Sequence, residues 1–220
     1  MNAPVIRLYD TQRSGNAWKI RIMAGLLGQP LERRTLSIDR GDLGTPAFAK
    51  LNRFRQVPLL ELPDGSAIPE SMAILFFLSA GTPWWPADRL EQAEVMSWLS
   101  FEQSRHMPPL AQLRLHLAIH PDWPLAAEQR ATWQRQAEEA LSILNTRLLE
   151  SGSEGWVAGA GQPSIADVAL YPYSRLARMA GLDLPRFEAV SDWIGRFEAL
   201  PGYQPLFPGR PDLNEHAEEI

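Results

Sequence analysis

The 220-residue chain contains no cysteine. This absence excludes disulfide bonds, thiolate zinc sites and any mechanism in which a protein thiol changes its oxidation state. The sequence also lacks an apolar run of about 18 or more residues. Its N-terminus does not show the basic-then-apolar layout of a secretory signal. We therefore expect a cytoplasmic protein with no membrane association.

The chain has no excess of positive charge. The chain has 21 Lys and Arg against 26 Asp and Glu, which gives a net charge of −5, and the basic residues form no cluster. A chain of this balance has no general attraction for nucleic acid. The 45% share of hydrophobic residues and the 21% share of charged residues are typical of a globular protein. The length is enough for a sizeable core and for one or two domains.

The first third of the chain alternates strand-like and helix-like segments. The Val5–Tyr9 stretch is short and apolar, whereas residues 16–28 carry apolar side chains at spacings of four and end at Gly28. Pro63, Asp64 and Gly65 supply the turn of a hairpin. The prediction is strands at 5–9, 31–37, 59–62 and 66–68, and helices at 16–28 and 70–79. This order predicts a small mixed sheet with helices packed on it.

A break follows Gly81, where two prolines and a glycine within six residues mark a linker. Beyond it the patterns predict helices and no strand: 91–104, 125–149, 165–179 and 187–200. We expect Pro108 and Pro109 to interrupt or kink the first of these. The polar tail from Pro208 is expected to wrap the surface or to be loose. The predicted organisation is an α/β domain at 1–81, a linker at 82–88 and an all-helical domain at 89–220.

Two motifs in the first domain suit a small zwitterionic peptide such as glutathione. Gln56-Val57-Pro58 offers main-chain hydrogen-bonding groups beside a candidate cis-proline, and Glu70-Ser71 places a carboxylate and a hydroxyl at the start of a helix. Acids and serines also favour the first turns of helices for structural reasons. The two interpretations of Glu70 and Ser71 are compatible, because the free N–H groups that attract a cap also attract a ligand carboxylate.

Three residues near the first helix are candidates for activating a thiol. Ser14 lies just before the helix, so it is either an ordinary N-cap or a hydrogen-bond donor to sulfur. Asn16, in the first turn, is a second donor or a local cap. Tyr9 is the rival activator; its alternative is packing between the strand and a helix.

These residues, in this order, resemble a bacterial cytosolic glutathione S-transferase of the serine type over roughly residues 4–200. The motifs that carry the resemblance are Leu8-Tyr9-Asp10, Arg13 to Lys19, Leu51-Asn52, Val57-Pro58, Glu70-Ser71, Trp98, Phe101-Glu102-Gln103 and Ser164 to Asp167. The resemblance implies a thioredoxin-like domain with a mixed four-stranded sheet, followed by an all-helical domain, in a homodimer. It makes glutathione the co-substrate.

The same resemblance implies roles for individual residues. Ser14 and Asn16 stabilise the thiolate, and a cis Val57-Pro58 bond pairs the backbone with the cysteinyl unit of glutathione. Glu70 faces the γ-glutamyl ammonium, Ser71 faces its carboxylate, and Gln56 is placed at the glycyl end.

The implied reaction is attack of the glutathione thiolate on a small hydrophobic electrophile or a peroxide. The alternative is a non-catalytic protein of the same fold that binds glutathione or a hydrophobic ligand. We expect Gln103, Arg105 and His106 to line the electrophile site; a solvated or interface face is the other interpretation.

Three further pairs of residues bear on loop conformation, metal binding and helix capping. Arg53 and Arg55 stand where the family pattern has proline and glycine, which bears on the loop conformation and on glutathione affinity. His116 and His120 lack a third ligand nearby, so we expect no metal site. Ser164 and Asp167 form a helix-capping box, and we interpret Asp167 as structural rather than catalytic.

Overall fold

The chain folds into two compact units. In the computed structural model, which describes residues 5–159 and 161–207, the first unit extends to Ala80 and also includes Pro201–Leu206. The second unit begins at Gly81 and extends to Leu200, with Phe207 added. The predicted linker at 82–88 thus falls at the start of the second unit. The tail from Pro208 lies outside the described residues.

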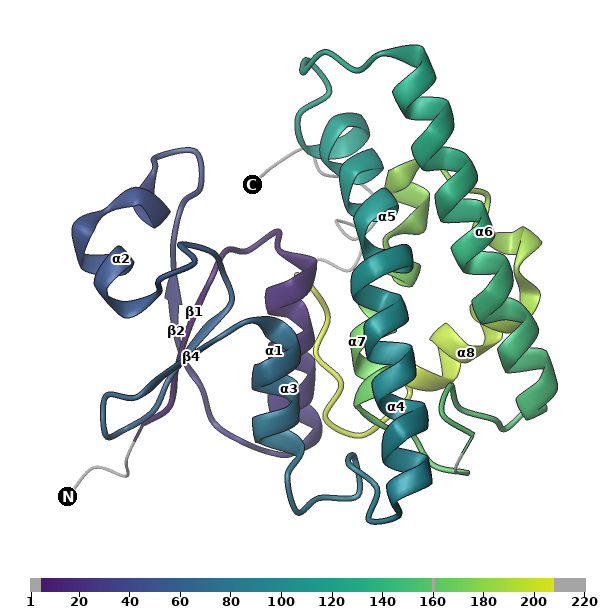
Figure 1. Cartoon of the computed structure of the whole chain (residues 1–220), viewed down its shortest axis with the longest axis horizontal. Helices are drawn as coiled ribbons and strands as arrows, with labels where there is room; N and C mark the ends of the chain where they lie inside the picture. Colours follow the sequence, from purple (N-terminus) through teal and green to yellow (C-terminus); the bar gives the residue numbers. More distant parts are fainter. Residues whose placement is uncertain (1–4, 160, 208–220) are drawn as a thin grey trace. The chain divides into compact units, whose positions relative to one another are not determined.

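The first unit is built on a four-stranded mixed sheet with the strand order β2-β1-β3-β4 (Figure 1). β1 pairs with β2 in parallel and with β3 antiparallel, and β4 pairs antiparallel with β3. The strands are β1 (Arg7–Asp10), β2 (Glu32–Thr35), β3 (Leu59–Glu61) and β4 (Ala67–Pro69). The sheet confirms the predicted fold class for this part of the chain.

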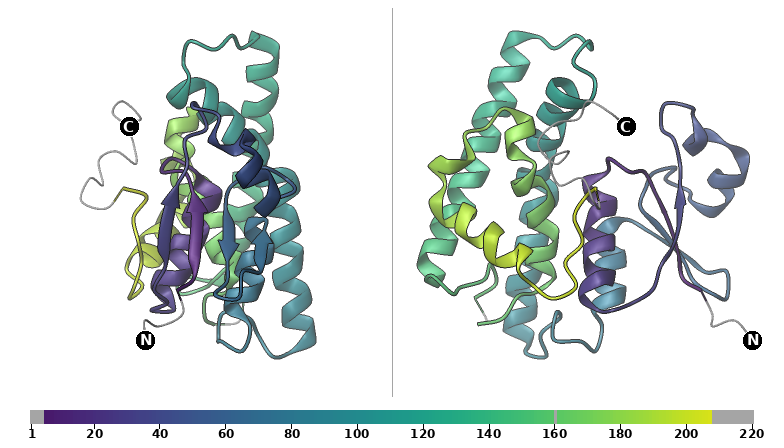
Figure 2. Two further views of the ribbon diagram at one scale, coloured as in Figure 1. Left: turned by 90° about the vertical axis from the view of Figure 1, so that its left-hand side faces the viewer. Right: turned by 180° about the vertical axis from the view of Figure 1, so that it is seen from behind.

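Helices cover both faces of this sheet. The helices α1 (Gly15–Leu26) and α3 (Ser71–Ser79) lie side by side on one face, and α2 (Pro46–Leu51) lies on the other (Figures 1 and 2). The sequence interpretation missed α2 and the 3₁₀ turn η1 (Asp42–Gly44) before it. The start signal was present, because the Thr45 hydroxyl caps the helix by accepting from the N–H of Phe48 and Pro46 occupies the first turn.

The segment Pro201–Leu206 belongs to the sheet unit although it follows the last helix of the chain (Figure 2). The predicted domain at 89–220 did not include this return. The Trp18 indole N–H donates to the Gln204 carbonyl at 2.7 Å. Gly25 and Gly202 permit the close approach of the two backbones, because a Cβ at Gly202 would lie 2.3 Å from the Gly25 oxygen. The segment is therefore held directly against α1.

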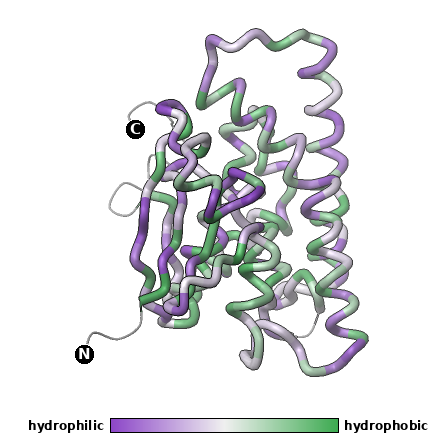
Figure 3. Tube along the Cα trace, turned by 60° about the vertical axis from the view of Figure 1, so that its left-hand side comes forward, coloured by the Kyte–Doolittle hydropathy of each residue, from purple (hydrophilic) through white to green (hydrophobic). Residues whose placement is uncertain are grey.

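The second unit is helical, and no strand is assigned in its described residues. Its α-helices are α4 (Arg89–Phe101), α5 (Met107–Arg114), α6 (Ala127–Ser151), α7 (Ile165–Arg175) and α8 (Glu188–Glu198). Shorter turns are the π-helical η2 (Glu102–His106) and η3 (Leu115–Ile119) and the 3₁₀ turns η4 (Ala177–Ala180) and η5 (Leu184–Arg186). Along α6, hydrophilic and hydrophobic positions alternate, and one face is buried (Figure 3). No helix among the described residues has the length and apolar character needed to cross a membrane.

Pro108 and Pro109 do not end the first helix of this unit. They lie in the first turn of α5, which continues from η2 without a break, and each proline lacks the N–H that would extend the regular hydrogen-bond ladder. The preceding turn η2 is π-helical, so the hydrogen-bond register changes just before the prolines. The predicted interruption is thus a local change of helix type.

Ser164 and Asp167 form the predicted capping box at the start of α7. The fully buried Asp167 carboxylate accepts from the backbone N–H of Ser164 at 2.9 Å and of Val157 at 3.0 Å, and from the Trp193 indole at 3.0 Å. Burial raises the pKa of this carboxyl, although the hydrogen bonds act in the opposite direction. These contacts join the connection before α7 to the helices α7 and α8, as a structural residue should.

Candidate active site

The strand registers bring three loops to one end of the sheet. Tyr9 of β1 is paired with Leu59 of β3, and Leu59 is paired with Pro69 of β4. β1 runs toward this row, β3 runs away from it and β4 runs toward it. The loop after β1, the residues before β3 and the residues after β4 therefore emerge together. They carry Ser14, Val57-Pro58 and Glu70-Ser71.

Ser14 is the N-cap of α1. Its backbone is extended (φ −72°, ψ 117°), and its Oγ accepts a hydrogen bond from the N–H of Ala17 at 3.1 Å. The N–H of Ser14 donates to the carbonyl of Thr11 at 3.1 Å, which closes the turn before the helix. An oxygen that already accepts from the backbone still has its own proton to donate. The positive end of the helix lies at the same position.

Asn16 lies in the first turn of α1, two residues after Ser14. Its Oδ1 atom is buried without a hydrogen-bond partner among the residues that the structure describes. The two ends of a carboxamide are told apart by their partners, so either end can be the one turned inward. The side chain thus retains unused hydrogen-bonding capacity beside Ser14.

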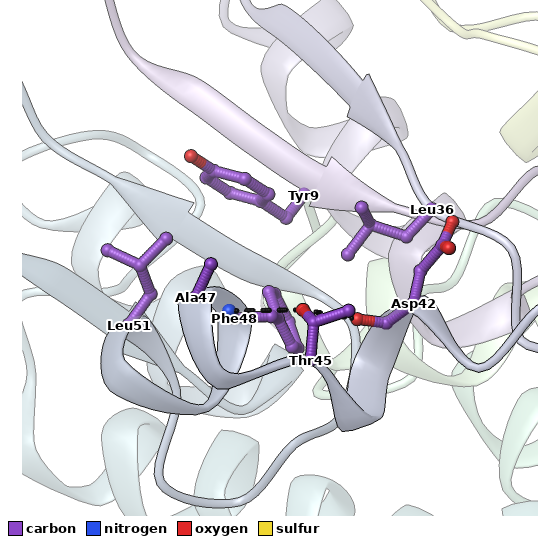
Figure 4. Close-up of a pocket in the computed structure, with 7 residues that line it drawn as sticks. All are labelled: Tyr9, Leu36, Asp42, Thr45, Ala47, Phe48 and Leu51. Carbon is purple, nitrogen blue, oxygen red and sulfur yellow. Dashed lines mark hydrogen bonds between the residues drawn. The ribbon is translucent and has the colours of Figure 1, made fainter.

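The Tyr9 side chain lies on the opposite face of the sheet from α1, where it contacts Glu61 and Phe48. Its hydroxyl donates to Oε2 of Glu61 at 2.8 Å, and its ring lies 6.0 Å from that of Phe48 on α2. Burial and the hydrogen bond to Glu61 raise the pKa of the phenol. Figure 4 shows Tyr9 and Leu36 facing α2 across a cavity of about 370 Å³. The packing interpretation of Tyr9 matches this environment, since a thiolate activator would need a free donor.

The Val57-Pro58 peptide bond is cis, as the resemblance implies. The loop before it is held by Asn52, whose side chain is 1% exposed. The Asn52 carboxamide donates to the carbonyl of Gln56 at 2.6 Å and accepts from the N–H of Phe54 at 2.9 Å. In the sequence Asn52 stands out only as part of the Leu51-Asn52 motif, and its role in holding the loop was missed. An asparagine just before a predicted loop was the available signal, because its side chain often hydrogen-bonds to nearby backbone groups.

Arg55 adopts a left-handed backbone conformation with φ 53°. This is the position where the family pattern has glycine, and the chain keeps the glycine-like conformation although arginine occupies it. Left-handed conformations cost L-residues about 1–2 kcal/mol. The N–H of Arg55 donates to the carbonyl of Asn52 at 3.0 Å, which helps to hold the turn. Arg53 is exposed, and its guanidinium lies 4.7 Å from the centre of the Phe54 ring.

Glu70 and Ser71 stand at the junction of β4 and α3. Glu70 has φ 73° and ψ 124°, which is rare for a residue with a side chain and marks a constrained position. Its exposed side chain does not cap the helix, and the first turn of α3 contains no acidic residue. The side chain of Ser71 is buried. The helix start therefore has backbone N–H groups available for an anion.

The three residues predicted for the electrophile site lie in η2 of the helical unit and have different environments. Gln103 donates to Oε2 of Glu102 at 2.6 Å, and Arg105 forms an exposed ion pair with Glu139 at 2.8 Å. His106 has no exposed surface, and its Nε2 lies 3.0 Å from the Ser174 hydroxyl. The burial of His106 favours a structural role over contact with a substrate.

No metal site is indicated among the described residues, where no three His, Cys, Asp or Glu side chains gather in a metal-binding arrangement. The His120 ring stacks on Trp123 at 4.0 Å, and His116 lies 5.7 Å from the ring of Trp133. The two histidines are therefore packed with aromatic rings.

Comparison with known proteins identifies the family. Residues 13–80 match the family described as Glutathione S-transferase, N-terminal domain, and residues 127–218 match Glutathione S-transferase, C-terminal domain. The crystal structure of a glutathione S-transferase from Pseudomonas fluorescens Pf-5 is 33% identical, covers 92% of this chain and 99% of that chain, and has a TM-score of 0.87. The protein belongs to the glutathione S-transferase family, with its thioredoxin-like N-terminal and all-helical C-terminal fold.

Two more distant relatives bear on the range of functions. The maleylacetoacetate isomerase of Pseudomonas aeruginosa is 25% identical over 225 residues, which cover 94% of this chain and 98% of that protein. The structure of Ure2p in complex with glutathione is 21% identical, covers 92% of each chain and has a TM-score of 0.82. At that identity the likeness to Ure2p shows the fold alone.

Proposed function

We propose that this protein is a glutathione transferase of the serine type, with Ser14 as the group that stabilises the glutathione thiolate. The observation that carries the proposal is the hydrogen bond from the Ala17 N–H to the Ser14 Oγ. Because the oxygen already accepts from the backbone, its proton is directed to another acceptor. A thiolate at the start of α1 is such an acceptor, and Asn16 is the second donor.

The free energy needed to lower the pKa of the glutathione thiol is within reach of one hydrogen bond and a helix N-terminus. A free thiol has a pKa near 8.5, so only a few per cent is ionised at neutral pH. Lowering that pKa by about two units takes roughly 2.7 kcal/mol. A hydrogen bond to a charged group contributes about 1.5–3 kcal/mol, and the N-terminus of α1 adds a further favourable field.

Glutathione would bind across the three loops that meet at the end of the sheet. The main chain of Val57 would pair with the cysteinyl unit, and Gln56 would lie at the glycyl end. Ser71 and the N–H groups of α3 would receive the γ-glutamyl carboxylate, and the exposed Glu70 would face its ammonium group. The constrained backbone of Glu70 supports this assignment, since such conformations cluster at ligand-binding positions.

The thiolate would attack a small hydrophobic electrophile or a peroxide, and Gln103 and Arg105 of the helical unit remain candidates for contacting that substrate. The name of the isomerase relative shows that isomerisation belongs to the range of reactions to be screened. The alternative is a non-catalytic protein that binds glutathione or a hydrophobic ligand, and the glutathione complex of Ure2p keeps this alternative open.

We also propose that the protein is a homodimer. Large apolar side chains are exposed on both units: Phe76 and Phe77 on α3, and Leu90 and Met96 on α4. Exposed large apolar side chains of this kind are the ones that an interface between subunits would cover. Sedimentation velocity should give a dimer that Phe76→Ser weakens; a wild-type monomer at micromolar concentration would contradict this part of the proposal.

The test of the mechanism is the ultraviolet absorbance of bound thiolate, followed against pH for the wild type and for Ser14→Ala. We expect thiolate to form well below pH 8 in the wild type and near the pKa of free glutathione in the variant. Asp88→Ala is the matched control, because Asp88 caps α4 through the N–H groups of Leu90 and Glu91. Glutathione binding without a lowered thiol pKa would support the binding-protein alternative.

A further inference from the structure

A buried carboxylate at the end of β1 gathers two arginines. Asp10 has no exposed surface, and its Oδ2 atom accepts from Nε of Arg33 at 2.9 Å. A second nitrogen of Arg33, Nη2, lies 2.8 Å from the same oxygen. Nε of Arg21 lies 3.6 Å from it. One carboxylate thus faces two guanidinium groups, and the cluster carries one positive charge in excess.

Arg21 is the member that reaches the loop before Ser14. Its Nη2 donates to the carbonyl of Gln12 at 3.2 Å, and its Nη1 donates to the carbonyl of Leu206 at 3.0 Å. Both carbonyls lie outside helices and strands, so no regular backbone ladder satisfies them. The Gln12 side chain is held as well, because its Oε1 accepts from Nη2 of Arg33 at 2.9 Å. The loop is therefore fixed two residues before Ser14.

The Leu206 end of this bridge is anchored independently of Arg21. The Trp18 indole holds the Gln204 carbonyl, and Gly202 lies directly against Gly25. The Arg21 guanidinium thus links the loop before Ser14 to a segment that follows it by more than 180 residues along the chain. The Pro201–Leu206 segment thus gives the Arg21 guanidinium a fixed anchoring point.

The charge of Arg21 persists at neutral pH. The side chain is 7% exposed, and burial together with the neighbouring Arg33 charge lowers its pKa to about 10. Asp10 acts in the opposite direction. Burial of a guanidinium is costly unless its donors are satisfied. Here Nη1 and Nη2 donate to two main-chain carbonyls, and Nε faces the Asp10 carboxylate at the longer distance of an ion pair, without a hydrogen bond. A side chain that holds backbone segments in place is expected to use its donors in this way.

We propose that Arg21 is a positioning residue for glutathione activation. Its guanidinium holds the carbonyl of Gln12, and through it the hydroxyl of Ser14, in the orientation that donates to the thiolate, with Pro201–Leu206 as the support. The inference rests on the proposed function. It adds that the thiolate site of the N-terminal domain is incomplete without a C-terminal segment.

The test compares Arg21→Met, Arg21→Lys and Arg7→Met in the full chain, with reduced glutathione as the ligand. Arg7 is the matched control, because it lies on the same strand as Asp10 and pairs with Glu32 and Glu61. The readouts are the pKa of the bound thiol, the dissociation constant of glutathione and the thermal midpoint. Gln12→Ala, which removes only the half-exposed side chain held by Arg33, is the second variant if Arg21→Met does not fold.

We expect Arg21→Met to raise the pKa of the bound thiol by about one unit, which is a roughly tenfold loss of thiolate below that pKa. The dissociation constant of glutathione should change little, Arg21→Lys should recover part of the shift, and Arg7→Met should leave it unchanged. Gln12→Ala should produce a smaller shift in the same direction.

A lower thermal midpoint with an unchanged thiol pKa in both Arg21→Met and Gln12→Ala would overturn the inference and leave the proposed function intact. If the wild type itself does not lower the thiol pKa, the proposed function fails and the inference fails with it. The wild-type titration therefore distinguishes the two failures.

Discussion

The backbone N–H of Ala17 donates to the Oγ of Ser14 at 3.1 Å, so the hydroxyl that we propose as the thiolate donor also caps α1. A capping role and a chemical role predict different effects of substitution. Glycine is nearly as good an N-cap as serine, whereas alanine is poor. Only the chemical role requires the hydroxyl itself.

Replacing Ser14 separately by glycine and by alanine therefore distinguishes the two roles. Ser14→Ala should lower the free energy of unfolding by about 1 kcal/mol, and Ser14→Gly by only a few tenths. Both variants should lose the lowered thiol pKa equally. Urea unfolding and thiolate titration measure the two effects. A thiol pKa that changes in step with stability would mean that Ser14 only caps the helix.

Arg55 provides a prediction about the loop before Val57. Since Arg55 has φ 53°, glycine removes the cost of a left-handed conformation, although it adds flexibility to the unfolded chain. We expect Arg55→Gly to raise the free energy of unfolding by about 0.5–1 kcal/mol. Chemical denaturation measures it.

The control for this prediction is Arg53→Gly, two residues earlier in the same exposed loop. Arg53 is outside the set of described residues with positive φ, so glycine there should be neutral or destabilising. Equal effects of the two substitutions would show that charge, and not backbone conformation, sets the stability of the loop.

Asn52 should matter for glutathione affinity more than for thiol ionisation. Asn52→Ala removes the bridge between the Gln56 carbonyl and the Phe54 N–H and leaves both part-buried backbone groups without these partners. We expect a loss of about 2 kcal/mol in stability and weaker binding of glutathione, because the loop that leads to Val57 is released. Calorimetric titration measures the affinity. A large shift in the thiol pKa at unchanged affinity would contradict this assignment.

Asn52→Asp separates the two halves of that bridge. The carboxylate can still accept from Phe54, but it faces the Gln56 carbonyl without a proton to donate. We expect it to weaken glutathione binding about as much as alanine does. Binding close to that of the wild type would show that the bond to Gln56 is dispensable.

The elements that the sequence predicted well are those with strong local signals. The helix after Ser14 has regularly spaced apolar side chains, and Ser164 with Asp167 is a self-contained capping box. The helix α2 was missed because six residues carry too little periodicity, even with Thr45 and Pro46 at its start. The strength of the local sequence signal thus decided which helices could be predicted.

The candidate site also contains residues with recognisable local motifs and residues that only the fold brings together. Ser14, Val57-Pro58 and Glu70-Ser71 occur as recognisable motifs, and the order of the strands accounts for their convergence. The Asp10, Arg21 and Arg33 cluster joins residues far apart in sequence, and Arg21 lies between two isoleucines in a helix that is otherwise apolar on that side. A charged residue inside an apolar pattern signals a buried partner but does not identify it. Identifying the Leu206 carbonyl required the return of the chain after α8.

Tyr173 on α7 gives a prediction about alkaline stability. Burial raises the pKa of its phenol to about 12; Arg114 acts to lower it and Glu102 to raise it. In the unfolded chain the pKa is near 10. Above pH 10 the unfolded state therefore loses a proton that the folded state keeps. The contribution of Tyr173 to the free energy of unfolding is full below about pH 10 and is lost as the pH rises toward 12.

Tyr173→Phe removes this one titration. Between pH 9 and pH 11 we expect the wild type to lose about 1 kcal/mol more of its free energy of unfolding than the variant loses. Urea denaturation at the two pH values measures the difference. Other groups that titrate in this range, such as the buried Arg21 with its pKa of about 10, are present in both proteins and cancel. Parallel losses in the two proteins would mean that the Tyr173 phenol ionises as readily in the folded chain as in the unfolded one.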